Sequence, residues 1–122
     1  MGTIANFEDY IRPARINDAD SGLAYELDFS RESVRFAESR GFRTSDLSDF
    51  PTTKIPEFFY YAFRKNHKNI PRATTDKLLD AMGGMPSALM ERLLQLYNQA
   101  GLLHLLSTDE DAGKNGTVTV EL

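Results

Sequence analysis

Two stretches of the chain alternate apolar and polar residues with the period of a β-strand. Residues 23–29 and 117–122 each have an apolar residue at every second position, which predicts strands with one buried face. Turn-forming residues fill 17–22, so residues 11–16 are expected to pair back on the first strand as a hairpin, with Pro13 confining that partner to a sheet edge. The predicted buried face of the first strand consists of Leu23, Tyr25, Leu27 and Phe29, and the opposite face of Ala24, Glu26 and Asp28.

The middle of the chain carries helix start and stop signals in succession. Ser30 is a typical N-cap, flanked by Phe29 and Val34 at the positions of a hydrophobic staple, and Gly41 is a typical stop. Pro56 suits the first turn of a second helix, where a proline costs no hydrogen bond. Four helices are expected. The first spans residues 30–40, and the second begins at 53 or 56 and ends within 67–69. The third spans 76–82 after a Thr74 or Thr75 cap, the fourth spans 86–106 with a weak point at Gly101, and a single helical turn is expected within 44–51.

These elements predict an α+β domain that is mainly α. About four helices pack together with a small N-terminal β-hairpin, and the C-terminal strand is a candidate third strand of its sheet. The chain of 122 residues, 41% hydrophobic, has room for one core. We expect one domain, 1–122, made of a hairpin region 1–29, a helical body 30–106, a flexible acidic linker 107–116 and a terminal strand 117–122.

Charge and composition exclude several classes of function. The net charge of −4 argues against broad binding to a nucleic-acid backbone, and the lack of Cys excludes a disulfide scaffold and sulfur-ligated zinc. Residues 1–10 form no apolar run and polar residues interrupt 89–106, so we expect no signal peptide, anchor or membrane span. His67 and His104 lie far apart without a metal motif, and no nucleophile or phosphate-loop motif is present. We therefore predict a protein that is not an enzyme and has no cofactor or metal.

One segment concentrates aromatic residues. Five of the 13 aromatic side chains fall within residues 58–63, and at about 100° per residue their rings point all round a helix. The pattern has two interpretations: a central core helix packed on all sides, or an aromatic face offered to a partner protein. The residues in question are Phe58, Phe59, Tyr60, Tyr61 and Phe63.

Two further patterns each leave two interpretations open. Arg64, Lys65 and Lys68 follow the aromatic segment. At the C-terminal end of a helix their positive charges would interact favourably with the helix dipole, or they would contact an acidic partner. In the last helix, Met90, Leu94 and Tyr97 form a row beside the main leucine row. That arc fits packing within the bundle or self-association through the outer row.

A helix-turn-helix reader of DNA is the alternative function. The helices before and after Gly83-Gly84 have that layout. The second helix of such a motif needs polar or basic side chains in its first turns to reach base edges. Residues 86–91 are instead apolar and acidic, so a nucleic-acid partner is disfavoured.

Three segments resemble the tail assembly chaperones of long-tailed, siphovirus-type bacteriophages, most closely those of Gram-positive phages and prophages. They are residues 25–38 (YELDFSRESVRFAE), 55–67 (IPEFFYYAFRKNH) and 75–80 (TDKLLD), and the similarity covers 23–106 in order. These motifs are packing and surface patterns without catalytic residues.

The resemblance implies a mostly helical, non-enzymatic protein that coats the phage tape measure protein, keeps its apolar helices soluble and helps recruit tail tube protein. It implies action in the host bacterial cytoplasm and absence from the mature virion, with a homo-oligomer and a longer frameshift form as further expectations. Together with the aromatic and leucine patterns, it leads to a hypothesis for the partner-binding residues: Phe58, Phe59, Tyr60, Tyr61, Phe63, Arg64, Lys65, Lys68, Met90, Leu94 and Tyr97.

Overall fold

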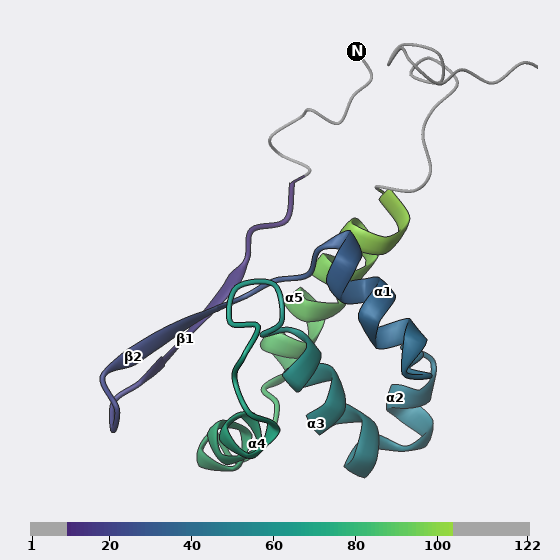
Figure 1. Ribbon diagram of the computed structural model, residues 1–122. Helices are drawn as coiled ribbons and strands as arrows, with labels where there is room; N and C mark the ends of the chain where they lie inside the picture. The colour runs from purple at the N-terminus through teal and green to yellow at the C-terminus, as the bar shows by residue number, and fades with distance from the viewer. Residues whose placement is uncertain (1–9, 104–122) are drawn as a thin grey trace, which may run out of the picture.

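A computed structural model describes residues 10–103, with side chains up to Gly101. The fold is α+β and mainly helical, as predicted (Figure 1). The expected linker 107–116, the terminal strand 117–122 and His104 lie outside the described residues. The elements in order are β1 (Ala14–Asp18), β2 (Leu23–Leu27), α1 (Arg31–Ser39), α2 (Asp46–Asp49), α3 (Pro51–Tyr61), α4 (Arg72–Ala81), α5 (Ser87–Asn98) and the π-helical segment η2 (Gln99–Leu103).

The predicted hairpin is confirmed. β1 and β2 pair antiparallel from Ala14 opposite Leu27 to Asp18 opposite Leu23, and the hairpin projects from the helical body (Figure 1). β1 starts at Ala14, directly after Pro13, which has no N–H to donate to a sheet hydrogen bond. The predicted polar face needs one correction, because Asp28 is only 3% exposed. It follows the last residue of β2, where the chain leaves the strand and no longer alternates.

Both ends of α1 form as their local sequence predicts. Ser30 Oγ accepts the Ser33 N–H at 3.1 Å, and Ser33 Oγ accepts the Ser30 N–H at 2.8 Å, which makes a reciprocal capping box. At the other end, Gly41 has a φ of +85°. Its N–H donates to the Glu38 carbonyl and the Phe42 N–H donates to the Ala37 carbonyl, so the helix ends in a Schellman motif.

The bounds of α3 and α4 differ from the prediction. α3 starts at Pro51, which takes the first helical position, so Pro56 lies inside the helix rather than in its first turn. It ends at Tyr61, well before 67–69. The Ala62 carbonyl accepts the Asp28 N–H at 3.1 Å, which ties this point of the chain to the residue after β2.

α4 begins earlier than expected, and α5 ends in a different kind of helix. The extended Pro71 precedes α4, and the Thr75 hydroxyl donates to the Arg72 carbonyl within the first turn instead of capping the helix. The regular helix α5 ends at Asn98 and continues as η2. The predicted weak point at Gly101 lies within η2. There a β-carbon on Gly101 would lie 3.3 Å from Val34 Cγ1, so this glycine allows η2 to approach α1 closely.

Four aromatic rings form the centre of the core. Phe58 of α3 stacks on Phe29 and on Phe42, each with ring centroids 5.4 Å apart. Tyr97 of α5 meets all three rings edge-on at centroid distances of 5.1, 5.9 and 5.8 Å. These contacts join the β2–α1 junction, the loop after α1, α3 and α5.

The left-handed backbone at Gly41 gives a direct test of the α1 stop. Nothing lies within 4 Å of a β-carbon placed on this residue, so only its backbone conformation opposes a side chain. We expect Gly41→Ala to lower the free energy of unfolding by about 1 kcal/mol, measured by urea denaturation. Gly41→Asn is the control and should lose less, because Asn tolerates this conformation better. Equal losses for the two variants would contradict a backbone origin.

Candidate functional site

The aromatic segment lies mainly in the core. Phe58, Phe59 and Phe63 are fully buried, and Tyr61 and Tyr97 are nearly so. The core interpretation is therefore correct for the four residues of the aromatic segment, and the hypothesis that their rings form a partner face is corrected: α3 packs against α1, α2 and α4, which cover its sides. Tyr97, from the outer row of the last helix, packs within the bundle. Tyr60 remains half-buried, with the Arg72 guanidinium 5.7 Å from its ring centre.

Two of the basic residues after α3, Arg64 and Lys65, hold other elements in place. Arg64 binds the Glu32 carboxylate of α1 with its Nη2 at 2.9 Å, and its guanidinium lies 3.7 Å from the ring centre of Phe36. Because α3 ends at Tyr61, these cations do not lie in its last turn, and the helix-dipole interpretation is wrong. Lys68 is exposed and forms no ion pair within the described part of the chain.

The segment between α3 and α4 also covers the outer edge of β2. The Glu26 N–H donates to His67 Nε2 at 3.1 Å, and the Asn66 side-chain amide donates to the Glu26 carbonyl at 3.4 Å. The His67 ring also meets the rings of Tyr25 and Phe63 edge-on. This histidine therefore caps a strand edge, a role that its isolated position in the sequence did not signal.

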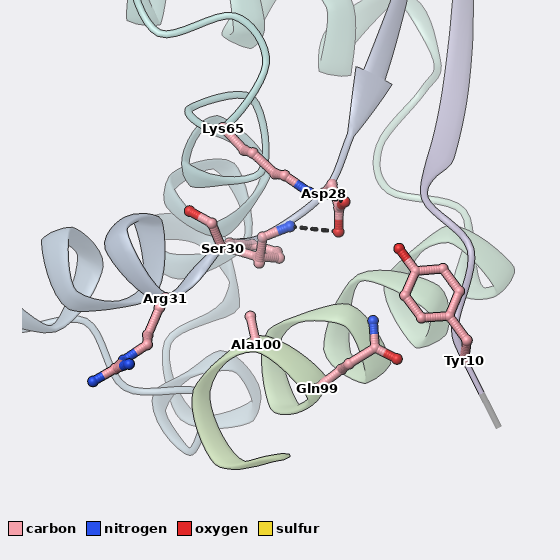
Figure 2. A pocket seen from close by; sticks show the side chains of 8 residues that line it. Tyr10, Asp28, Ser30, Arg31, Lys65, Gln99 and Ala100 are labelled. Carbon is pink, nitrogen blue, oxygen red and sulfur yellow. Dashed lines mark hydrogen bonds and ion pairs between the residues drawn. The ribbon is translucent and has the colours of Figure 1, made fainter. Parts of the chain in front are cut away.

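Asp28 and Lys65 form an ion pair at the wall of a cavity of about 320 Å³. Figure 2 shows the two side chains pointing toward one another, with Tyr10 and Gln99 on the other side. Lys65 Nζ lies 2.7 Å from Asp28 Oδ2, and Asp28 Oδ1 accepts the Phe29 N–H at 2.8 Å. The hydrogen bond to Asp28 raises the pKa of Lys65. Both carboxylate oxygens of Asp28 are thus already engaged by the protein.

A larger groove of about 460 Å³ lies between the hairpin and α4. We call it the hairpin–α4 groove. Its apolar lining comes from Leu23 and Tyr25 of β2 and from Leu78 and Ala81 of α4, and Asp18, Asp20 and Lys77 are among its polar residues. Leu23 is 54% exposed, which is unusual for a large apolar side chain here. Sequence reasoning placed Leu23 on a buried face and missed this groove, because α4 is distant from the hairpin in the chain.

The remaining predicted binding residues are dispersed. Met90 and Leu94 are half-buried on α5, packed against the core. Tyr60, Arg64 and Lys68 line a small hollow of about 10 Å³, too narrow for a side chain. The structure therefore brings three members of the predicted set together at this hollow, and Met90 and Leu94 are not among its lining residues.

The layout expected for a DNA reader offers little basic surface. α5 carries one basic residue, Arg92, and its Nη1 donates to the Arg12 carbonyl at 3.1 Å, so this side chain ties down the segment before β1. Within residues 10–103, no three His, Asp or Glu side chains form a group suited to a metal ion. In the same span, no helix has the length and apolar character needed to cross a bilayer.

The buried Asp28 should matter more to stability than an exposed carboxylate in a similar pair. Asp28→Asn removes the ion pair with Lys65, whose own side chain is 39% exposed and can hydrate again. We expect a loss of about 1–2 kcal/mol in the free energy of unfolding. Asp76→Asn is the matched control, since its pair with Arg72 is exposed on both sides and should change stability by less than about 0.5 kcal/mol. Comparable losses in urea denaturation would contradict the importance of burial.

Two buried tyrosines predict a loss of stability in alkaline solution. Burial and Glu57 raise the pKa of Tyr61, and burial together with Glu38 raises the pKa of Tyr97 to about 12, from an ordinary value of 10.0. Above pH 10.0 the unfolded chain therefore binds fewer protons than the folded protein, so stability falls as pH rises. Lys65 acts in the same direction. We expect the Tyr61→Phe/Tyr97→Phe variant to show a shallower decline between about pH 10 and about pH 12 in urea denaturation. An unchanged slope would contradict this assignment.

Comparisons with known proteins give one family. Neither the curated proteins nor the solved structures contain a significant match to the chain. The family model described as "Domain of unknown function (DUF5055)" matches residues 9–122. Since this match spans nearly the whole sequence, the chain belongs to the DUF5055 family.

Proposed function

We propose that the protein is a phage tail assembly chaperone. It binds apolar helical segments of the tape measure protein, keeps them soluble and helps recruit tail tube subunits. In this role it acts in the host bacterial cytoplasm and is absent from the finished virion. The resemblance of residues 25–38 and 55–67 to such chaperones supports the proposal.

The hairpin–α4 groove is the observation that carries the proposal. An amphipathic helix binds a partner by placing apolar side chains, three or four residues apart, into an apolar groove. Leu23, Tyr25, Leu78 and Ala81 supply such a surface, and Leu23 is already exposed in the free protein. The tape measure segment therefore binds without any opening of the aromatic core.

Charges beside this groove favour one kind of helix. Asp18 and Asp20 of the hairpin turn are among its polar residues, against Lys77 of α4. A helix with basic residues flanking its apolar face complements the hairpin side. The net charge of −4 on the whole chain also helps to keep a complex with an apolar partner in solution.

A charge placed in the groove should weaken binding of the tape measure segment. Leu23→Glu puts a carboxylate where an apolar side chain of the tape measure helix would lie, and the exposed position of Leu23 leaves the fold intact. Co-expression with tape measure fragments, followed by light scattering, should give a soluble complex with the unaltered protein. We expect Leu23→Glu to weaken that complex by at least about tenfold.

Phe50→Glu is the matched control. Phe50 is 60% exposed and lies outside the groove, so this variant has the same added charge and loses an equally accessible apolar side chain. It should keep the complex. If Leu23→Glu and Phe50→Glu solubilise fragments equally well, the groove is not the binding site. If the unaltered protein leaves every fragment insoluble, the chaperone function itself is wrong.

A further inference from the structure

A second groove runs between α1 and α5. It consists of two hollows, of about 350 Å³ and about 420 Å³, that share Glu38, Thr44 and Tyr97 as lining residues. We call it the α1–α5 groove. It contains none of the residues of the hairpin–α4 groove, and α1 lies across the helical body from the projecting hairpin (Figure 1).

Arginines dominate the charge of this groove. Arg31 and Arg35, one helical turn apart on α1, line the first hollow, and Arg43 lines the second. None of the three forms an ion pair with another residue of the described region. Glu38 is the one carboxylate among the lining side chains. The groove therefore has an excess of positive charge in a protein that is acidic as a whole.

Tyr97 brings to the same place a hydroxyl that has no hydrogen-bond partner among the described residues. Its side chain is 8% exposed and its ring is held by Phe29, Phe42 and Phe58. The hydroxyl makes no hydrogen bond within residues 10–103, although every fully enclosed side-chain nitrogen and oxygen there has a partner. Tyr97 lines both hollows of the groove. The hydroxyl is protonated at neutral pH and can donate, and the raised pKa of Tyr97, about 12, extends this into alkaline solution.

We propose that the α1–α5 groove binds an acidic peptide segment of a partner protein. Carboxylates of that segment pair with Arg31 and Arg35, whose planar guanidinium groups suit two parallel hydrogen bonds to a carboxylate. The Tyr97 hydroxyl donates a further hydrogen bond from the floor. This site goes beyond the hairpin–α4 groove and does not depend on it.

The groove fits a peptide better than a nucleic acid. Its lining includes the apolar side chain of Val34, which can contact an apolar side chain beside the carboxylates of a peptide. A phosphate backbone would instead bring repeated charges past Glu38 and toward a chain of net charge −4. An acidic peptide can place its carboxylates near the arginines and an uncharged residue near Glu38.

The test uses the full chain and two labelled, capped helical peptides of equal length. One carries two Glu residues one turn apart next to a Leu, and the other carries Gln in their place. Fluorescence anisotropy should show the Glu peptide binding at least about tenfold more tightly than the Gln peptide. Tyr97→Phe keeps the ring and should weaken binding of the Glu peptide by about tenfold, because it removes a hydrogen bond to a charged group.

Two further variants should move affinity in opposite directions. Arg31→Gln/Arg35→Gln should weaken binding of the Glu peptide by more than about tenfold. Glu38→Gln should strengthen it severalfold, since the repelling carboxylate is gone, and a variant that merely damages the fold would not do this. The matched controls Tyr60→Phe and Arg15→Gln/Lys68→Gln change groups outside the groove and should leave affinity unchanged. Circular dichroism and urea denaturation report whether each variant folds.

Several results would overturn the proposal. Equal affinity for the Glu and Gln peptides, or no binding of the Glu peptide, excludes a carboxylate site. Tighter binding of a DNA duplex, lost in Arg31→Gln/Arg35→Gln, assigns the groove to nucleic acid. Binding only after neutralisation of Asp109, Glu110 and Asp111 shows that the chain's own acidic segment is the occupant. Leu23→Glu should bind the peptide normally, so a failure of this site is distinguishable from a failure of the chaperone function.

Discussion

The arrangement of the helices depends on the stacking of Phe58 between Phe29 and Phe42, with Tyr97 edge-on to all three. Each ring comes from a different part of the chain, and each aromatic pair contributes about 0.5–1.5 kcal/mol beyond the burial of its surface. α3 must therefore occupy the centre, and its neighbours cover it on several sides. Because the core uses these rings, a surface that binds a partner has to take most of its side chains from outside the aromatic core.

Hydrogen bonds and ion pairs then fix the hairpin against this core. The Ala62 carbonyl, Lys65 and His67 engage Asp28 and Glu26, at and just beyond the outer edge of β2. A two-stranded hairpin is marginal by itself in water, so the connection after α3 stabilises it and sets its position. The same anchoring places the tip of the hairpin beside α4. The hairpin–α4 groove thus depends on the polar contacts at the outer edge of β2.

The features that local sequence determines were predicted, and those that tertiary contacts determine were not. The hairpin, the Ser30 cap and the Gly41 stop depend on neighbours within a few residues. The end of α3 at Tyr61 and the burial of Asp28 were not predicted. They occur where the Asp28 N–H donates to the Ala62 carbonyl, a hydrogen bond between residues far apart in the chain. The aromatic segment had two interpretations because periodicity shows that rings point all round a helix, but not what surrounds that helix. For the same reason, neither groove could be inferred from one segment alone.

The two grooves differ in charge, and this difference bears on how the protein could hold a long partner. Acidic residues of the hairpin turn lie at the hairpin–α4 groove, whereas arginines line the α1–α5 groove. A partner with basic and acidic stretches could engage both, and each site would disfavour the stretch that suits the other. Linked sites also raise the effective concentration of the second contact, so two weak grooves can give firm binding. The hairpin–α4 groove lies outside the aromatic core, and the α1–α5 groove meets the core only at Phe42 and Tyr97. Binding at either one therefore requires no loss of the contacts that keep the domain folded.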